Sequence, residues 1–219
     1  MRIPRAATLG LIGLALVTTK VRAQQSDSFK WYLGAQAGLL GFETQSQLRG
    51  WAPSVGAQLN IVAKRSGLII SVDEAFGSNE TTQYTDATTE ARTRDVSFDR
   101  IRKYSAILTG YPVRGRTQPY FGIGFGLMQV MDPVPGGIFT SPIQANLARQ
   151  LASRKSTDGF VTLVGGIQFR VSQMVAFGQY QLASSPSAGN LLRGPTHSLV
   201  GGLRFSLGAA KEGIHGGGY

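Results

Sequence analysis

Residues 163–169 read Leu-Val-Gly-Gly-Ile-Gln-Phe, and residues 199–205 repeat the pattern as Leu-Val-Gly-Gly-Leu-Arg-Phe. In both copies large apolar side chains occupy alternate positions, which share one face of a β-strand, while Gln168 or Arg204 points to the other face. In a soluble sandwich the apolar face would pack against a second sheet. In a membrane barrel it would face lipid, and the polar face would line the interior.

The composition fits a single domain and excludes several kinds of chemistry. The chain has 219 residues and no cysteine, so disulfides, thiolate metal sites, cysteine nucleophiles and lipoprotein acylation are not available. Two histidines leave no metal constellation, and we expect no cofactor. The formal net charge is +10, but the basic residues are dispersed, so the charge suits an anionic surface and does not indicate nucleic-acid binding.

The N-terminus resembles an export signal. Arg2 and Arg5 precede a short apolar run, and Val21 and Ala23 are small residues at the positions that a signal peptidase reads. We therefore predict a signal peptide over residues 1–23, with a retained membrane anchor as the alternative. No other segment has the roughly 18 consecutive apolar residues of a transmembrane helix, so any part that crosses a membrane must be β.

Eight segments of residues 24–207 alternate between apolar and polar positions and predict strands. Their ranges are 30–42, 51–63, 68–77, 95–111, 119–130, 159–171, 174–182 and 197–207. The fourth has an ambiguous register, because Val96, Phe98 and Tyr104 would share a face with Arg100 and Arg102. Either a bulge interrupts this strand or its upper half leaves the membrane.

The connections between these segments alternate in length, which a soluble sandwich does not require. Residues 43–50, 78–94, 131–157 and 183–196 are long connections, and residues 64–67, 112–118 and 172–173 are short turns. Residues 78–94 are polar and predict either an exposed loop or two solvated strand extensions. The alternation predicts an all-β fold, an eight-stranded antiparallel up-and-down transmembrane β-barrel with short periplasmic turns and long external loops.

Aromatic and polar side chains give two further predictions. Aromatic residues near the strand ends should form two interfacial girdles; these are Trp31, Phe42, Trp51, Tyr111, Tyr120, Phe121, Phe160, Phe169 and Phe205. Polar residues on the opposite faces should form an interior plug in a barrel too narrow for an open pore; these are Gln36, Gln58, Asn60, Asp73, Gln168, Arg170, Gln179, Gln181 and Arg204. Asp73 should be the countercharge for Arg170 or Arg204.

Two local patterns need interpretation. Gly122, Gly124 and Gly126 alternate as a crowded barrel interior requires, and they lack the helix and acidic residue of a dinucleotide site. Ser141 before Pro142 predicts a helix start, with apolar residues at helical spacing over residues 143–155. This helix would either pack on the barrel mouth or bind a partner or lipid headgroups.

The mature chain resembles the small outer-membrane barrels of the OmpA/OmpX-like and opacity-protein-like surface antigens. The resemblance rests on Pro-Tyr-Phe-Gly-Ile-Gly at 119–124, Gly-Gln-Tyr at 178–180 and Gly-Gly-Leu-Arg-Phe at 201–205. It implies an outer-membrane location with both termini periplasmic, contact with lipid and lipopolysaccharide, and recognition by the barrel-assembly machinery. The chain departs from the pattern in a polar tail, residues 208–219, which we expect to be flexible and which follows the usual terminal aromatic position.

The leading hypothesis is a non-enzymatic surface barrel that acts through its extracellular loops, by surface binding, adhesion or envelope integrity. One alternative is a lipid A-modifying hydrolase, for which His197 would be the base. However, Ser198 is adjacent to it on a strand and should point to the opposite face. The other alternative is a soluble periplasmic lipocalin-like barrel, whose apolar face would point inward around a ligand.

Overall fold

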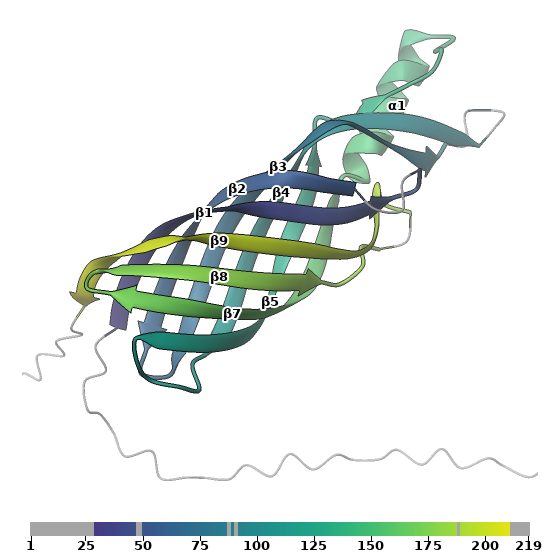
Figure 1. The fold of residues 1–219 in the computed structure, drawn as a ribbon. Coiled ribbons are helices and arrows are strands. Elements are labelled where there is room, and N and C mark those ends of the chain that lie inside the picture. Colours follow the sequence, from purple (N-terminus) through teal and green to yellow (C-terminus); the bar gives the residue numbers. More distant parts are fainter. Residues whose placement is uncertain (1–28, 47–49, 87–88, 90–91, 188, 211–219) are drawn as a thin grey trace, which may run out of the picture.

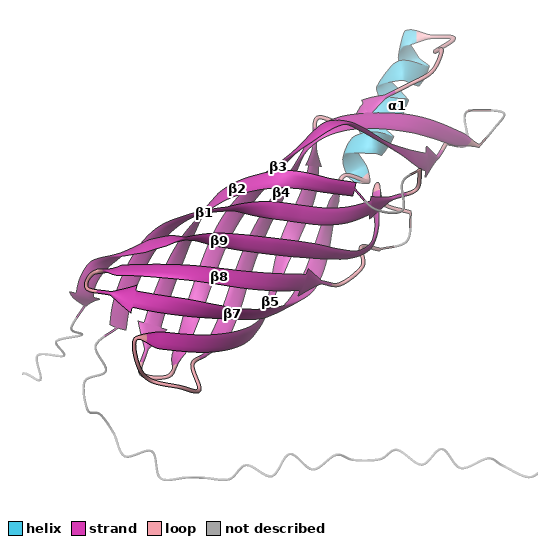
Figure 2. Ribbon diagram, in the orientation of Figure 1, coloured by secondary structure: helices cyan, strands magenta, loops and turns pink. Residues whose placement is uncertain are grey.

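The computed structural model describes residues 29–46, 50–86, 89, 92–187 and 189–210 and consists almost entirely of strands (Figures 1 and 2). Eight long strands are each antiparallel to their neighbours in the ring. They are β1 (Phe29–Thr44), β2 (Gly50–Ala63), β3 (Ser66–Thr85), β4 (Thr93–Gly110), β5 (Thr117–Met131), β7 (Thr157–Val171), β8 (Met174–Ala183) and β9 (Leu192–Ala210).

The strands follow the order β3-β2-β1-β9-β8-β7-β5-β4, and pairing between β3 and β4 closes the ring. A two-residue strand, β6 (Val134–Pro135), adds to β4, and one helix, α1 (Pro142–Arg154), follows it. The predicted eight-stranded antiparallel up-and-down barrel is confirmed.

Side chains alternate between the two faces of the wall, and the apolar ones point outward. In the two repeated segments Leu163 and Leu199 are 55 % and 57 % exposed, whereas Val164 and Val200 beside them are both 4 % exposed. Gly166 also faces inward, because a Cβ there would lie 2.6 Å from the Tyr120 ring. The outer wall is therefore an apolar surface, and the lumen is packed with side chains.

The long connections are shorter than predicted, because the strands extend beyond the barrel wall. β3 and β4 continue as a paired ribbon to Thr85 and Thr93, so most of residues 78–94 form the predicted strand extensions. The alternation of inward and outward side chains changes phase along β4: Val96 and Phe98 point inward, and so do Ile101 and Lys103. A register shift between Phe76 and Glu80 accompanies this change; its extra residues lie in β3, and the bulge was expected in the fourth strand. The assignment of Val96 and Phe98 to the face of Tyr104 was wrong.

The C-terminal boundary of the barrel also differs from the prediction. β9 continues to Ala210, and Gly208 and Ala210 pair with Trp31 and Phe29 of β1. The predicted tail therefore begins three residues too early. Residues 211–219 and the predicted signal peptide lie outside the described residues.

Two apolar clusters close the lumen at different positions. One packs Ile69, Ile107, Tyr111, Tyr120 and Val164. The larger one lies toward the long connections and joins the strand extensions to α1; its members are Leu40, Phe42, Ala52, Ala75, Tyr84, Val96, Phe98, Ile101, Met128, Val130, Ala152, Phe160, Ala183, Leu191 and Leu192. In the part of the chain that the structure describes, no helix is long and apolar enough to cross a membrane.

Candidate functional site

Arg204 of β9 points into the lumen, and its side chain is fully buried. Its Nε and Nη2 donate to Oε1 of Gln58 at 3.2 and 2.9 Å, and its Nη1 donates to Oε1 of Gln168 at 3.0 Å. The guanidinium carbon lies 3.9 Å from the centroid of the Phe177 ring. Amide oxygens and an aromatic face thus hold this cation in a site that excludes water.

Glutamine side chains extend this network in both directions. Gln58 donates to Gln36 at 2.8 Å, and Gln36 donates to Asp73. On the other side Gln168 donates to Gln118 at 2.8 Å. This series of hydrogen bonds crosses the lumen from β3 to β5 and connects six strands.

The predicted direct pairing of Asp73 is wrong for both arginines. Arg204 reaches Asp73 only through two glutamines, because the Gln58 and Gln36 side chains lie between the guanidinium and the carboxylate. Arg170 is half-buried and donates to Gln118 at 3.3 Å. Asp73 instead accepts from Gln36 and, at 3.2 Å, from Ser71.

Lys103 is a buried lumen cation that the sequence reasoning missed. Its Nζ donates to Oε1 of Gln181 at 2.8 Å and to the Ser198 hydroxyl at 2.9 Å, which links β4 to β8 and β9. The outward positions of Tyr104 and Leu108 imply an inward Lys103, so the alternation contained the signal. The Asp73 and Lys103 side chains also line a cavity of about 10 Å³, room for about one water.

The remaining predicted plug residues also lie at the lumen. Asn60 donates to the Tyr111 hydroxyl at 3.4 Å, and Gln179 accepts from the Tyr120 hydroxyl at 2.7 Å. Gln181 accepts from Lys103 as described. Of the nine predicted plug residues, all but Arg170 are buried.

The predicted aromatic girdles need correction at four positions. Phe42, Tyr111, Tyr120 and Phe160 are buried in the lumen, with exposed fractions of 7 % or less. Strand alternation explains two of them, because Tyr120 precedes the outward Phe121 and Phe160 precedes the outward Val161. The outward members of the predicted set are Trp31, Trp51, Phe121, Phe169 and Phe205.

Lumen contacts account for the inward aromatics. Tyr111 and Tyr120 place their hydroxyls in the polar network, where each finds a hydrogen-bond partner. The Phe42 and Phe98 rings pack together with centroids 6.3 Å apart. Phe160 fills the space beside Gly126, where a Cβ would lie 2.4 Å from its ring. These residues close the lumen and do not contact the surroundings of the barrel.

A cap projects from the long-connection end of the barrel and is built from the β3–β4 extension, β6 and α1 (Figure 1). Arg94 and Asp86 form a buried ion pair at 2.7 Å, and Arg94 also donates to the Gly136 carbonyl at 2.9 Å. The Tyr84 hydroxyl donates to the Ala148 carbonyl of α1 at 3.2 Å. These contacts fix the helix to the strand ribbon.

The helix forms where it was predicted but packs on a different stripe. Ser141 caps it by accepting from the Gln144 amide at 3.2 Å, and Pro142 occupies the first turn. Ala148 and Ala152 are its buried residues, whereas Ile143 and Leu147 are 72 % and 46 % exposed. Small alanines allow the close approach to Tyr84; Leu151 packs partly against the larger cluster, and Ile143 and Leu147 remain outside.

A band of outward charges lies between the apolar wall and the cap. Glu74 accepts from Arg102 at 2.8 Å and from Arg100 at 3.2 Å, and Arg100 also contacts Asp132 at 2.8 Å. On β3 these charges follow the outward Ile70 and Val72. The apolar wall therefore ends at this level, and the strand extensions project beyond it.

The residues of the hydrolase alternative are not brought together. His197 faces outward, and Tyr180 shares a hydrogen bond with its Nδ1. Ser198 points into the lumen and binds Lys103. In the described ranges there is also no cluster of three metal-ligating side chains.

Three comparisons place the chain among known proteins. A family model described as the outer membrane protein beta-barrel domain matches residues 9–190. No curated protein matches the sequence.

Similar solved structures include Neisserial surface protein A, with 9% identity, a TM-score of 0.53, and coverage of 80% of this chain and 96% of that chain. They also include two proteins of Pseudomonas aeruginosa. The N-terminal β-barrel domain of OprF has 9% identity, a TM-score of 0.39, and coverage of 79% and 96%. OprG has 12% identity, a TM-score of 0.37, and coverage of 83% and 94%. Since the family model spans most of the 219 residues, the chain belongs to the outer membrane protein β-barrel family.

Proposed function

We propose that this protein is a non-enzymatic, non-conducting barrel of the outer membrane that binds an external partner through its cap. The barrel spans the membrane with both termini in the periplasm after residues 1–23 are removed. Outer-membrane lipid and lipopolysaccharide surround its wall, and the barrel-assembly machinery inserts it.

The filled lumen supports a non-conducting barrel. Arg204 and Lys103, each with its own amide partners, fill it at two levels, and Phe42, Phe98 and Phe160 fill it toward the cap. An eight-stranded barrel is just wide enough for side chains to fill. A transport role would require this packing to open.

The observation that carries the binding proposal is the apolar surface on the cap. Ile138, Ile143 and Leu147 are 93 %, 72 % and 46 % exposed on or just before a well-anchored helix. Arg149 and Arg154 lie on the same helix, which has no acidic residue in its first turn. Ordered apolar residues beside cations suit a protein partner with an apolar patch and acidic neighbours.

Photo-crosslinking on intact cells tests this proposal. A photoreactive amino acid at position 143 should give a discrete protein adduct, and the adduct should disappear when Leu147→Glu is added. The same probe at position 123, on the outer wall, is the matched control and should give no such adduct. A cap without adducts, or an adduct that Leu147→Glu leaves unchanged, would contradict binding through α1.

The absence of a serine beside His197 supports a non-enzymatic role. Among the described residues that line the pocket at His197, none is a serine. If His197→Ala altered the lipid A composition of cells that produce the protein, the non-enzymatic assignment would be wrong.

A further inference from the structure

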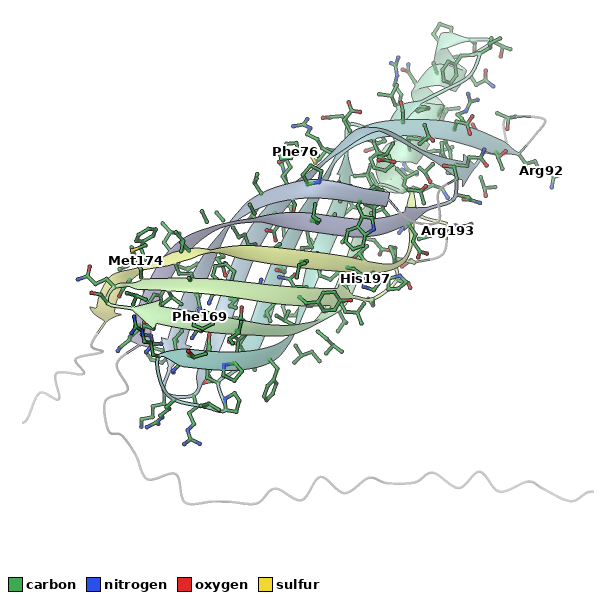
Figure 3. The ribbon with its side chains drawn as sticks, in the orientation of Figure 1. Phe76, Arg92, Phe169, Met174, Arg193 and His197 are labelled. Atoms are coloured by element: carbon green, nitrogen blue, oxygen red, sulfur yellow. The ribbon has the colours of Figure 1, made fainter. Side chains whose placement is uncertain are left out.

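A pocket of about 280 Å³ opens on the outer wall of the barrel, near the long-connection end of β1, β2, β8 and β9. Figure 3 shows His197 on this part of β9. The residues that line the pocket are Gly41, Phe42, Glu43, Gly50, Trp51, Tyr180, Pro195 and His197. This wall pocket is separate from both the lumen network and the exposed face of α1.

A glycine between two rings creates the hollow. Gly41 of β1 pairs with Trp51 of β2 on one side and with His197 of β9 on the other. Its missing side chain leaves a gap in the wall, and the Trp51 ring leans over it: a Cβ at position 41 would lie 2.9 Å from that ring. A larger residue at position 41 would collide with the Trp51 ring and displace it from the pocket wall.

A polar pair forms one side of the pocket. The Tyr180 hydroxyl and His197 Nδ1 are hydrogen-bonded, and the two ring centroids lie 6.0 Å apart. This bond uses one of the two nitrogens of His197, so the second can still donate or accept. Trp51 and Pro195 are the apolar side chains of the lining, Glu43 is charged, and the Phe42 ring points into the lumen, so the pocket offers apolar contact with a few polar groups.

The pocket lies where the apolar wall meets the polar rim. Two residues along the strands toward the short turns, Leu39 and Leu199 are 45 % and 57 % exposed. In the other direction Glu43, which itself lines the pocket, lies opposite Arg193 in the strand register, so charged residues begin at the rim of the pocket. Tryptophan, tyrosine and histidine are amphipathic and suit this boundary between hydrocarbon and headgroups.

We propose that this pocket binds one acyl chain of a lipid in the outer leaflet. The acyl chain lies in the hollow beside the Trp51 ring, bounded by Pro195 and the Tyr180–His197 pair, and its ester group receives a hydrogen bond from that pair. The small volume admits a single chain, and the position at the hydrocarbon boundary matches the place where acyl chains join their ester groups. The barrel thereby holds one specific lipid at a fixed place on its wall.

Tryptophan fluorescence tests the site, because the chain has only two tryptophans. Trp31→Phe leaves Trp51 as the single reporter in the pocket. In vesicles with increasing amounts of phospholipid brominated on its acyl chains, a bound chain should quench Trp51 in a saturating manner at a low mole fraction. Trp51→Phe leaves Trp31, an outward residue at the opposite end of the barrel, whose quenching should follow the bulk mole fraction.

Three substitutions in the Trp31→Phe background examine the pocket itself: Gly41→Leu, His197→Ala and Tyr180→Phe. Each should raise the mole fraction that half-quenches Trp51 by about tenfold, which corresponds to about 1.4 kcal/mol. Heat-modifiable gel migration identifies any variant that does not fold. The proposal is then judged from the quenching of the variants that do fold. Quenching that follows the bulk mole fraction in the parent, or saturation unchanged in the variants, would overturn the proposal.

Competition with unbrominated lipids distinguishes the two lipids that could supply such an acyl chain, lipopolysaccharide and glycerophospholipid. Unbrominated lipopolysaccharide that restores Trp51 fluorescence at a low mole fraction would identify a lipopolysaccharide chain as the occupant. Restoration only by unbrominated phospholipid would identify a glycerophospholipid chain. Restoration by neither, at mole fractions that should displace a bound chain, would overturn the proposal.

Discussion

Asp73 and Arg204 are joined through two glutamines and do not touch. Gln36 contacts the carboxylate, Gln58 accepts two hydrogen bonds from the guanidinium, and a 2.8 Å hydrogen bond connects the two amides. Each glutamine both donates and accepts a hydrogen bond, so the two amides connect the carboxylate to the guanidinium without a direct ion pair. The plug is therefore a cooperative unit, and its members should be unequal in importance.

Arg204→Met should destabilise the barrel by about 3 kcal/mol, because it leaves the buried oxygens of Gln58 and Gln168 without their donor. Arg170→Met is the matched control. Its side chain is only half-buried and donates one hydrogen bond of 3.3 Å, so a loss below about 1 kcal/mol is expected. Urea unfolding in lipid vesicles measures both. Equal losses would show that the lumen network is not centred on Arg204.

Gly165 and Gly166, the adjacent glycines of the first repeated segment, should differ sharply in whether they tolerate a larger side chain. A Cβ at position 166 would lie 2.6 Å from the Tyr120 ring and 2.7 Å from the Gly178 carbonyl oxygen, whereas a Cβ at position 165 meets nothing within 4 Å. Gly166→Val should therefore overpack the lumen and cost about 3 kcal/mol or more, while Gly165→Val folds normally. Heat-modifiable gel migration reports folding. A tolerated Gly166→Val would mean that the inward face is assigned wrongly.

Planar bilayers containing the purified protein should show no steady ion conductance. Replacing residues 142–154 with a short Gly-Ser linker should leave the barrel closed, since Phe42, Phe98 and Phe160 fill the mouth from the strands themselves. Opening of a stable conductance in this variant would show that α1, and not the lumen packing, closes the barrel. Conductance in the parent protein would contradict the closed lumen altogether.

The cap should weaken at high pH through Tyr84. Burial raises the pKa of Tyr84 above its ordinary value of 10.0; the Asp86 carboxylate acts in the same direction, and the Arg94 guanidinium opposes them. A raised pKa in the folded cap means that the neutral phenol stabilises it fully below pH 10, and this contribution is lost as the pH rises through the raised value.

Proteolysis of the cap in vesicles, measured against pH, tests this dependence. Cleavage should increase above pH 10, and Tyr84→Phe should remove that increase while raising cleavage at neutral pH, because the hydrogen bond to Ala148 is lost. The difference in phenolate absorbance between the two proteins gives the titration directly. Titration of Tyr84 at or below pH 10 would contradict its burial in the cap.

The wall of the barrel was predictable from the sequence, because a period of two determines which side chains share a face. The outward Leu163 and Leu199 and the buried Gln168 and Arg204 follow from that period alone. The aromatic positions were less predictable, since Tyr120 and Phe121 are adjacent and an aromatic near a strand end can face either way. Their direction depends on lumen contacts, such as the hydrogen bond from Tyr120 to Gln179.

The cap could be predicted only in part. The capping pattern of Ser141 and Pro142 predicted a helix, but the stripe that packs contains Ala148 and Ala152, not the larger Ile143 and Leu147. Hydrophobic periodicity favours large residues for the buried side, whereas the close approach of Tyr84 requires small ones. The phase change within β4 was similarly hidden, because it depends on the pairing of this strand with β3.

The central claim is that the apolar outer face of the barrel contacts lipid, and spin-label accessibility in vesicles tests it most directly. The chain has no cysteine, so Leu163→Cys and Leu199→Cys each provide one labelling site. The account predicts that both labels collide often with oxygen and rarely with a water-soluble nickel reagent. Labels that collide freely with the nickel reagent would place this face in water and contradict a membrane-spanning barrel.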